Sequence, residues 1–145
     1  MRLGFYLTGS QPVERVLPLI ARAALGQDQR LLVVAEDAGL LDRLDRALWE
    51  GRPEEFLPHG RAEAAHAERQ PVLLSTTCVP VNGAKLVALA DGAWRDEAEA
   101  FDRALLFFGE EQRAEARQIW RRFDGREDVT REFFELENGK WTKRA

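Results

Sequence analysis

Arginine and tryptophan side chains recur at helical spacing towards the end of the chain. Arg113, Arg117 and Trp120 stand at positions i, i+4 and i+7, so a helix would present them as one stripe. Guanidinium groups form charge-assisted hydrogen bonds with carboxylates, and a half-buried indole beside them supplies an apolar wall. This combination indicates a groove for an acidic peptide or a free C-terminal carboxylate. The alternative is a solvated helix face, because acidic residues alternate with the arginines along the same stretch.

A second pair of aromatic residues flanks a charged loop in the stretch LWEGRPEEFLPHG. Trp49 falls at the end of a predicted helix whose leucines face the core, and Phe56 falls in the proline-bounded loop that follows. Aromatic side chains in such places are typical of hot spots in protein interfaces. The same two residues could instead cover an edge of the sheet, and the sequence alone favours neither interpretation.

Residues that could support catalysis or metal binding are few. Cys78 is the single cysteine, and a nucleophilic cysteine needs a base such as His59 beside it. A lone cysteine is more often a small, buried apolar side chain. His59 and His66 are seven residues apart, which is not a usual spacing for metal ligands. We therefore expect no catalytic residues and no bound metal.

The loop after the first apolar run is the place where a nucleotide-binding fold would hold phosphate. It reads TGSQPVE, with Gly9 as its single glycine, and the chain contains neither G-x-G-x-x-G nor G-x-x-x-x-G-K-[ST]. Pro12 also removes one of the backbone amides that would face a phosphate. Glu36 and Asp37 follow the second run, where such folds place a ribose-binding acid, but here they favour a helix cap. We expect no cofactor.

Short, continuous apolar runs alternate with helix-like stretches along the chain. Runs of this kind suit strands that are buried on both faces of a parallel sheet. They occupy residues 3–7, 31–35, 72–75, 85–90 and 104–108. The alternation predicts an α/β fold, namely a three-layer Rossmann-like domain with a mostly parallel central sheet and no nucleotide-binding glycine loop.

Helical periodicity predicts three helices that pack on this sheet, over residues 12–26, 38–49 and 110–123. Ser10 is expected to cap the first helix, and Pro18 predicts either a kink or a later start. Residues 51–60 are predicted to form an ordered loop, and residues 61–70 a short helix or a mobile connection. Asn138 followed by glycine, between two β-prone segments, predicts a hairpin.

The composition limits the kind of protein that this chain can be. A chain of 145 residues with 45% apolar residues can form one domain, which we take as residues 1–145. With 21 basic and 25 acidic residues the formal net charge is -4, which argues against a surface that binds nucleic acid throughout but not against a local basic patch. The single cysteine, and the lack of a signal-like or membrane-spanning run, predict a cytoplasmic protein.

Several of these stretches, in this order, resemble the chi subunit family of the bacterial DNA polymerase III holoenzyme. The resemblance is carried by FYL near the start, LLVVAED, LDRALWEGRPEEFLPHG and the final arginine-aromatic helix. It implies a Rossmann-like fold without catalysis or nucleotide. It also implies that Arg113, Arg117 and Trp120 bind the acidic, phenylalanine-terminated tail of single-stranded-DNA-binding protein. A psi-like subunit of the clamp-loader assembly, or a helicase-like protein, would contact Trp49 and Phe56.

Two parts of the chain depart from the family pattern: residues 66–86 match only in their strand-like pattern, and the segment from Asp124 onward is richer in charge. We predict a non-catalytic adaptor that links polymerase III to single-stranded-DNA-binding protein, with no direct DNA binding and no membrane contact. One alternative is a flavodoxin-like nucleotide- or flavin-binding protein or small enzyme. Another is a direct DNA binder that uses Arg113 to Arg126, which the interleaved acids disfavour.

Overall fold

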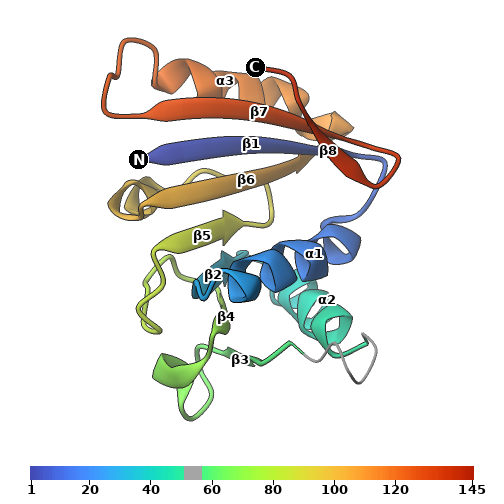
Figure 1. Cartoon of the computed structure of the whole chain (residues 1–145), viewed down its shortest axis with the longest axis vertical. Coiled ribbons are helices and arrows are strands. Elements are labelled where there is room, and N and C mark those ends of the chain that lie inside the picture. Colours follow the sequence, from blue (N-terminus) through green and yellow to red (C-terminus); the bar gives the residue numbers. More distant parts are fainter. Residues whose placement is uncertain (51–56) are drawn as a thin grey trace.

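A single sheet organises the fold. In the computed structural model, which describes residues 1–50 and 57–145, eight strands pair in the order β3-β4-β2-β5-β6-β1-β7-β8 (Figure 1). Neighbouring strands are parallel except β8, which runs antiparallel to β7. The strands are β1 (Arg2–Gly9), β2 (Leu31–Val34), β3 (His59–Arg61), β4 (Val72–Ser75), β5 (Leu86–Leu89), β6 (Arg103–Gly109), β7 (Thr130–Glu137) and β8 (Lys140–Lys143).

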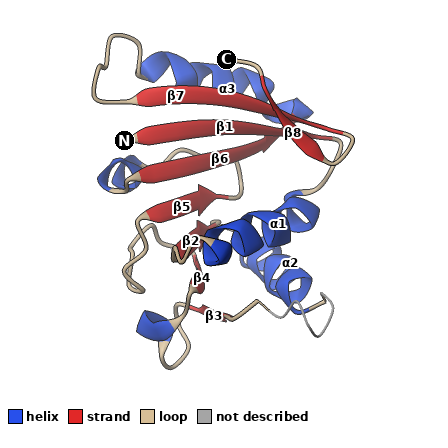
Figure 2. Cartoon of the chain, viewed as in Figure 1, coloured by secondary structure: helices blue, strands red, loops and turns tan. Residues whose placement is uncertain are grey.

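Helices cover both faces of this sheet (Figure 2). One face carries α1 (Val13–Gly26) and α2 (Ala38–Trp49), and the other carries α3 (Arg113–Arg122). Short 3₁₀ helices are η2 (Ala67–Arg69), η3 (Asp96–Ala100) and η4 (Glu110–Gln112). The predicted three-layer α/β fold with a mostly parallel sheet is therefore confirmed. None of the helices among the described residues could span a lipid bilayer.

Burial on both faces explains the continuous apolar runs of the strands. Every residue of β2, β4 and β5 is buried, so these strands show no alternation between apolar and polar side chains. Along β1 the side chains alternate between two cores: Phe5 and Leu7 face α3, whereas Tyr6 faces the α1 side. The five strands predicted from apolar runs are confirmed, with small shifts at their ends.

The start of α1 differs from the prediction. Pro12 occupies the N-cap position with an extended backbone and no side-chain cap, so the predicted cap by Ser10 is wrong. Proline fits there because its fixed φ angle suits entry into a helix. Pro18 lies inside α1, and the late start is not observed because the helix already begins at Val13. The helix therefore continues through this proline.

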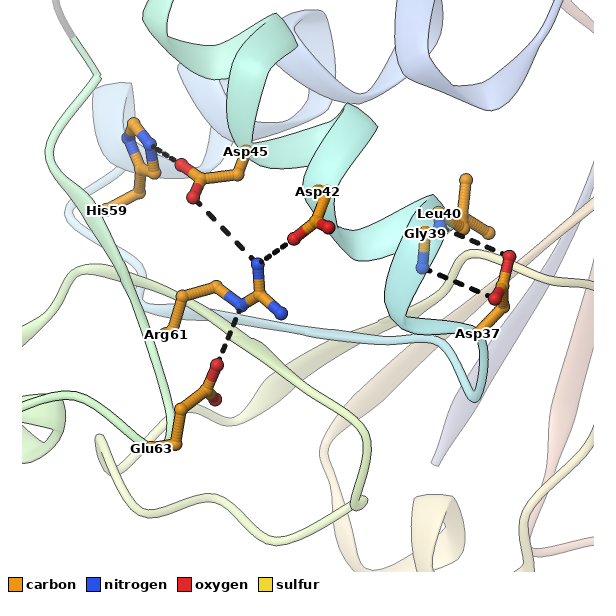
Figure 3. A network of polar contacts seen from close by, with 8 residues as sticks. All are labelled: Asp37, Gly39, Leu40, Asp42, Asp45, His59, Arg61 and Glu63. Carbon is orange, nitrogen blue, oxygen red and sulfur yellow. Dashed lines mark hydrogen bonds and ion pairs between the residues drawn. The ribbon is translucent and has the colours of Figure 1, made fainter.

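α2 begins with the cap that the sequence predicts. The Asp37 carboxylate accepts hydrogen bonds from the backbone amides of Gly39 and Leu40 at 3.3 and 3.2 Å (Figure 3). These amides have no partner within the helix, so the cap satisfies them. The neighbouring amide of Glu36 donates instead to Asp91 at 3.0 Å. The interpretation of this acidic pair as capping residues is confirmed for Asp37.

The segment after α2 contains structure that the sequence did not indicate. Residues 51–56 of the predicted loop lie outside the described residues, and β3 begins at His59. This three-residue strand at the sheet edge has no apolar run to reveal it, so the loop prediction is wrong there. Of the two alternatives for residues 61–70, the structure shows the short helix, as the 3₁₀ helix η2 over Ala67–Arg69.

The predicted hairpin is confirmed by β7 and β8. Asn138 and Gly139 join the two strands with φ angles of 51° and 76°, the left-handed pair typical of a tight type I′ turn. The hairpin also brings aromatic rings to Tyr6, whose ring stacks on Phe134 at 4.9 Å and meets the edge of Trp141 at 5.1 Å. These contacts anchor the end of the chain to the α1 face of the sheet.

Removing the Asp37 cap should destabilise the fold. We expect Asp37→Ala to lower the free energy of unfolding by about 1 kcal/mol, because two amides of the first turn lose their acceptor. Urea unfolding followed by circular dichroism measures this change. Asp37→Asn is the matched control, since asparagine is also a good capping residue. An alanine variant as stable as the wild type would show that the cap contributes nothing.

Candidate functional site

α3 carries the predicted stripe of arginine and tryptophan. Its buried face consists of apolar residues at helical spacing, as predicted: Ala116, Ile119 and Phe123. Gln112 fixes the start of the helix, because its Oε1 accepts from the Gly109 amide at 3.0 Å and its Nε2 donates to the Asp91 carbonyl at 2.8 Å. The predicted helix over residues 110–123 therefore begins with the 3₁₀ turn η4 and continues as α3.

Beside the buried face of α3 lies a pocket of about 280 Å³. Arg113, Arg117 and Trp120 all line it, so the structure brings the three residues of the stripe to one hollow. The rest of its lining is largely apolar and comes from several segments: Phe5 of β1, Phe108 of β6, Ala116 of α3, Phe133 of β7, and Ala145. The pocket thus combines an apolar floor with two guanidinium groups.

The two arginines of this pocket differ in their electrostatic surroundings. The Arg113 guanidinium donates to both carboxylate oxygens of Glu110, at 2.6 and 3.2 Å, and lies 3.8 Å from Glu135. The hydrogen bond with Arg113 lowers the pKa of the Glu110 carboxyl. Arg117 is exposed and has no hydrogen bond or ion pair with any residue in the described ranges. Arg117 is therefore the cation that an incoming anion can reach without displacing a carboxylate.

Trp120 forms a wall of the pocket and is held by contacts with Phe5 and Arg131. Its ring lies 5.0 Å from the ring of Phe5, at a tilted angle of 59°. The guanidinium of Arg131 lies over the indole at 4.8 Å, a cation–π contact, and also donates to the Trp120 carbonyl and to Asp124. The ring is nevertheless only partly buried. An apolar surface of this kind, rigid and half-exposed, is suited to contact a ligand side chain.

Sequence reasoning identified the helical part of this pocket and missed its floor. Phe5, Phe108 and Phe133 come from three different strands, and the sequence gives no sign that parallel pairing places them together. Arg131 lies in β7 and reaches Trp120 across a separation of 11 residues. The one feature visible in the sequence is that each of the three strands carries a phenylalanine. This feature does not indicate a pocket, because aromatic residues in strands also fit ordinary core packing.

The second predicted surface is described only in part. Trp49 ends α2 and remains 60% exposed, as expected for a residue beyond the leucine face, while Phe56 lies outside the described residues. The indole meets the ring of His59 edge-on at 5.1 Å. The His59 side chain is 1% exposed, with Nδ1 2.6 Å from the Leu57 carbonyl and Nε2 2.7 Å from Asp45 (Figure 3). The exposed indole of Trp49 therefore packs against a buried ring.

An ion-pair network next to His59 joins α2 to β3. Arg61 Nη1 donates to Asp42 at 2.9 Å and lies 4.0 Å from Asp45 (Figure 3). Its Nε lies 3.3 Å from Glu63 but forms no hydrogen bond. Because these groups bond to one another, the histidine and its neighbours have a structural role in holding the end of α2.

Cys78 and His59 have other surroundings than a nucleophile and its base would have. Its thiol is buried on the α3 side of the sheet, and burial raises its pKa, with a smaller contribution from the charge of Glu97. Both ring nitrogens of His59 are occupied by Asp45 and Leu57. In the described residues, no group of three or more His, Cys, Asp or Glu side chains could hold a metal ion. Cys78 is therefore a protonated core residue.

The carboxyl ends of the strands, where this fold class usually binds nucleotides, form a hollow of about 500 Å³ that is poorly suited to phosphate. Its lining includes Asp91 and Glu111, and no arginine or lysine of the described chain. Burial alone would raise the pKa of Asp91, but hydrogen bonds from Arg95 and two backbone amides outweigh it and lower the pKa. The Thr8 hydroxyl donates to the Phe108 carbonyl at 3.3 Å. The Asp91 carboxylate and the Thr8 hydroxyl therefore hold together the loops at this edge of the sheet.

Comparison with known proteins identifies a family for this chain. A model of the family described as DNA polymerase III chi subunit, HolC, matches residues 1–128. That range contains the whole of α3 and Trp49, and the β7–β8 hairpin lies beyond it. No curated protein matches the chain. Because the match covers most of its length, the chain belongs to the DNA polymerase III chi subunit family.

Proposed function

We propose that this polymerase III subunit is a non-catalytic adaptor in the cytoplasm that holds the acidic C-terminal tail of single-stranded-DNA-binding protein. The observation that carries this proposal is the pocket beside α3, a largely apolar hollow lined also by Arg117, which has no ion pair among the described residues. Family membership supports a role as an accessory subunit of DNA polymerase III. The tail-binding role rests on the pocket and on the resemblance of its residues to the family pattern.

Each part of the pocket has a separate role in this proposal. Arg117 binds the terminal carboxylate or an acidic side chain of the tail, because its guanidinium has no internal partner in the described chain. Arg113 adds positive charge but stays tied to Glu110. Trp120 and the phenylalanines of the sheet contact the last side chain of the tail, and aromatic rings favour such tilted or edge-on contacts. Because the arginines are exposed, added salt weakens binding.

Arg117→Ala tests the proposed tail contact. We expect affinity for a synthetic acidic, phenylalanine-terminated tail peptide to fall about ten- to a hundredfold, since one charge-assisted hydrogen bond is lost. Fluorescence anisotropy with labelled peptide measures the dissociation constant. The matched control is Arg122→Ala, which removes the same charge from the same helix at a residue that does not line the pocket. Equal affinities for wild type and Arg117→Ala would refute the assignment.

Glu110→Gln tests whether the acid competes with the tail. Loss of the carboxylate releases Arg113, so we expect tail affinity to rise about two- to fivefold, the range typical of an exposed ion pair. The same anisotropy titration measures the gain. Glu115→Gln, in the adjoining helix α3, changes the net charge equally and should produce a smaller gain. If both variants gain the same affinity for the tail peptide, the gain comes from the change in net charge and not from the release of Arg113.

The surface around Trp49 is the proposed contact for a second partner, a psi-like subunit or a helicase-like protein. We expect Trp49→Ala to abolish that contact and to leave tail binding intact, because the exposed indole lies on α2 and not in the α3 pocket. Immobilised wild type and variant are incubated with native cell extract, and captured clamp-loader subunits and single-stranded-DNA-binding protein are quantified.

Leu19→Ala, another exposed apolar residue, is the control for this experiment. Retention of clamp-loader subunits by Trp49→Ala would exclude this surface. A fall in its unfolding temperature together with loss of both partners would show that Trp49 is a core residue instead.

A further inference from the structure

A row of basic residues lies at the amino ends of four neighbouring strands. Arg2 and Arg103 begin β1 and β6, while Arg30 and Lys85 directly precede β2 and β5. These strands are consecutive in the sheet order and parallel, so their amino ends share one edge. In Figure 1 this edge is at the left, where the arrows of β1, β6 and β5 begin. It is the edge opposite the carboxyl ends of the strands.

This edge is hollowed as well as basic. A depression of about 510 Å³ is lined by all four basic residues and by two acids, Asp28 and Asp102. Neither acid forms an ion pair within 4.0 Å among the described residues. Adjacent strands lie about 4.8 Å apart, so the row spans about 14 Å. A protein with a net charge of -4 therefore presents a local excess of positive charge here.

Most of these cations lack a carboxylate partner. Arg2 pairs with Glu132 at 2.9 Å, but the guanidinium of Arg103 donates to the Tyr6 hydroxyl at 2.8 Å. Lys85 is exposed and has no side-chain hydrogen bond or ion pair within the described chain. Arg2 and Arg103 are also direct cross-strand neighbours, an arrangement in which like charges repel. An external anion would relieve that repulsion.

The backbone under this row is held in place. Arg30 donates to the carbonyls of Glu68 and Asn82 at 3.0 and 2.7 Å, which ties two loops to its side chain. Asn82 is 1% exposed, and its side chain donates to the carbonyls of Leu31 and Gln70 at 3.3 and 2.9 Å. Little conformational entropy is therefore lost when a ligand binds to these loops.

We propose that this basic edge binds the phosphates of single-stranded DNA. A row of cations on successive strands suits a ligand with regularly repeated negative charges, and guanidinium groups pair well with phosphate oxygens. The family acts in DNA replication, which favours a phosphodiester chain over an acidic peptide as the occupant. The contact is weak and salt-sensitive, and it lies on a different surface from the α3 pocket. The proposal differs from the sequence-based expectation of no direct DNA binding, and the net charge is compatible with such a local basic patch.

Oligo-dT binding at low salt tests this site. With about three phosphates neutralised, affinity should fall about 20-fold between about 50 and 200 mM salt. Lys85→Glu should reduce the affinity about tenfold at about 50 mM salt. It should also reduce the slope of log affinity against log salt concentration by about 0.7, because one phosphate contact is lost. Anisotropy of a labelled oligonucleotide measures both quantities on the full chain.

Lys140→Glu is the charge-matched control, since this exposed residue of β8 lies away from the basic edge. It should bind oligo-dT nearly as the wild type does, and the unfolding temperatures of both variants verify folding. No binding by the wild type, or equal loss in both variants, would overturn the proposal. Binding of a labelled polyaspartate peptide without any binding of oligo-dT would assign the basic edge to an acidic protein instead. That result would also refute the proposal.

Discussion

The candidate site depends on the pairing of β1 with two parallel neighbours. β1 lies between β6 and β7, and Phe5 stands beside Leu106 on one side and Phe133 on the other. Because side chains alternate along a strand, this register turns Phe5 and Phe133 to the α3 face together. A slip of one residue would turn either ring away and remove the floor of the pocket. α3 supplies the arginines and Trp120, but the sheet determines that an apolar surface lies beneath them.

Ion pairs decide which of the many cations are available to a ligand. In the pocket, Arg113 is held by Glu110, and in the segment after α3, Arg126 is held by Glu99 and Asp128. The hydrogen bond from Arg126 lowers the pKa of Asp128 to about 2, so this pair stays ionised at neutral pH. A new anion that approached these arginines would have to compete with an internal carboxylate. Arg117 faces no such competitor in the described chain, which distinguishes it although its sequence context is equally rich in acids.

The parts that sequence predicted are those set by local spacing. The two faces of α3 follow from the 3.6-residue period, since Ile119 and Arg117 lie on the same helix and differ only in direction. Continuous apolar runs identified five strands for a similar reason, because burial on both faces acts on each residue separately. Phe133 and its partner Phe5 could not be predicted as neighbours, since their contact depends on pairing across more than a hundred residues. The cap by Ser10 failed because several nearby residues could have begun the helix, and proline at position 12 began it instead.

The fold class by itself predicts a ligand site at the carboxyl ends of the strands, whereas both proposed binding surfaces lie elsewhere. In Rossmann-like proteins the carboxyl ends of the strands hold the ligand, yet here that edge uses its polar groups internally. Asp91 binds Arg95 and the loop amides, and Gln112 bridges two loops above it. A phosphate placed there would meet carboxylates, while Arg117 at the α3 flank and Lys85 at the amino ends have no carboxylate partner among the described residues. The strand topology of a common fold limits where a binding surface can form. Which of these positions can bind a ligand then depends on where unpaired charges lie beside an accessible apolar surface or a hollow.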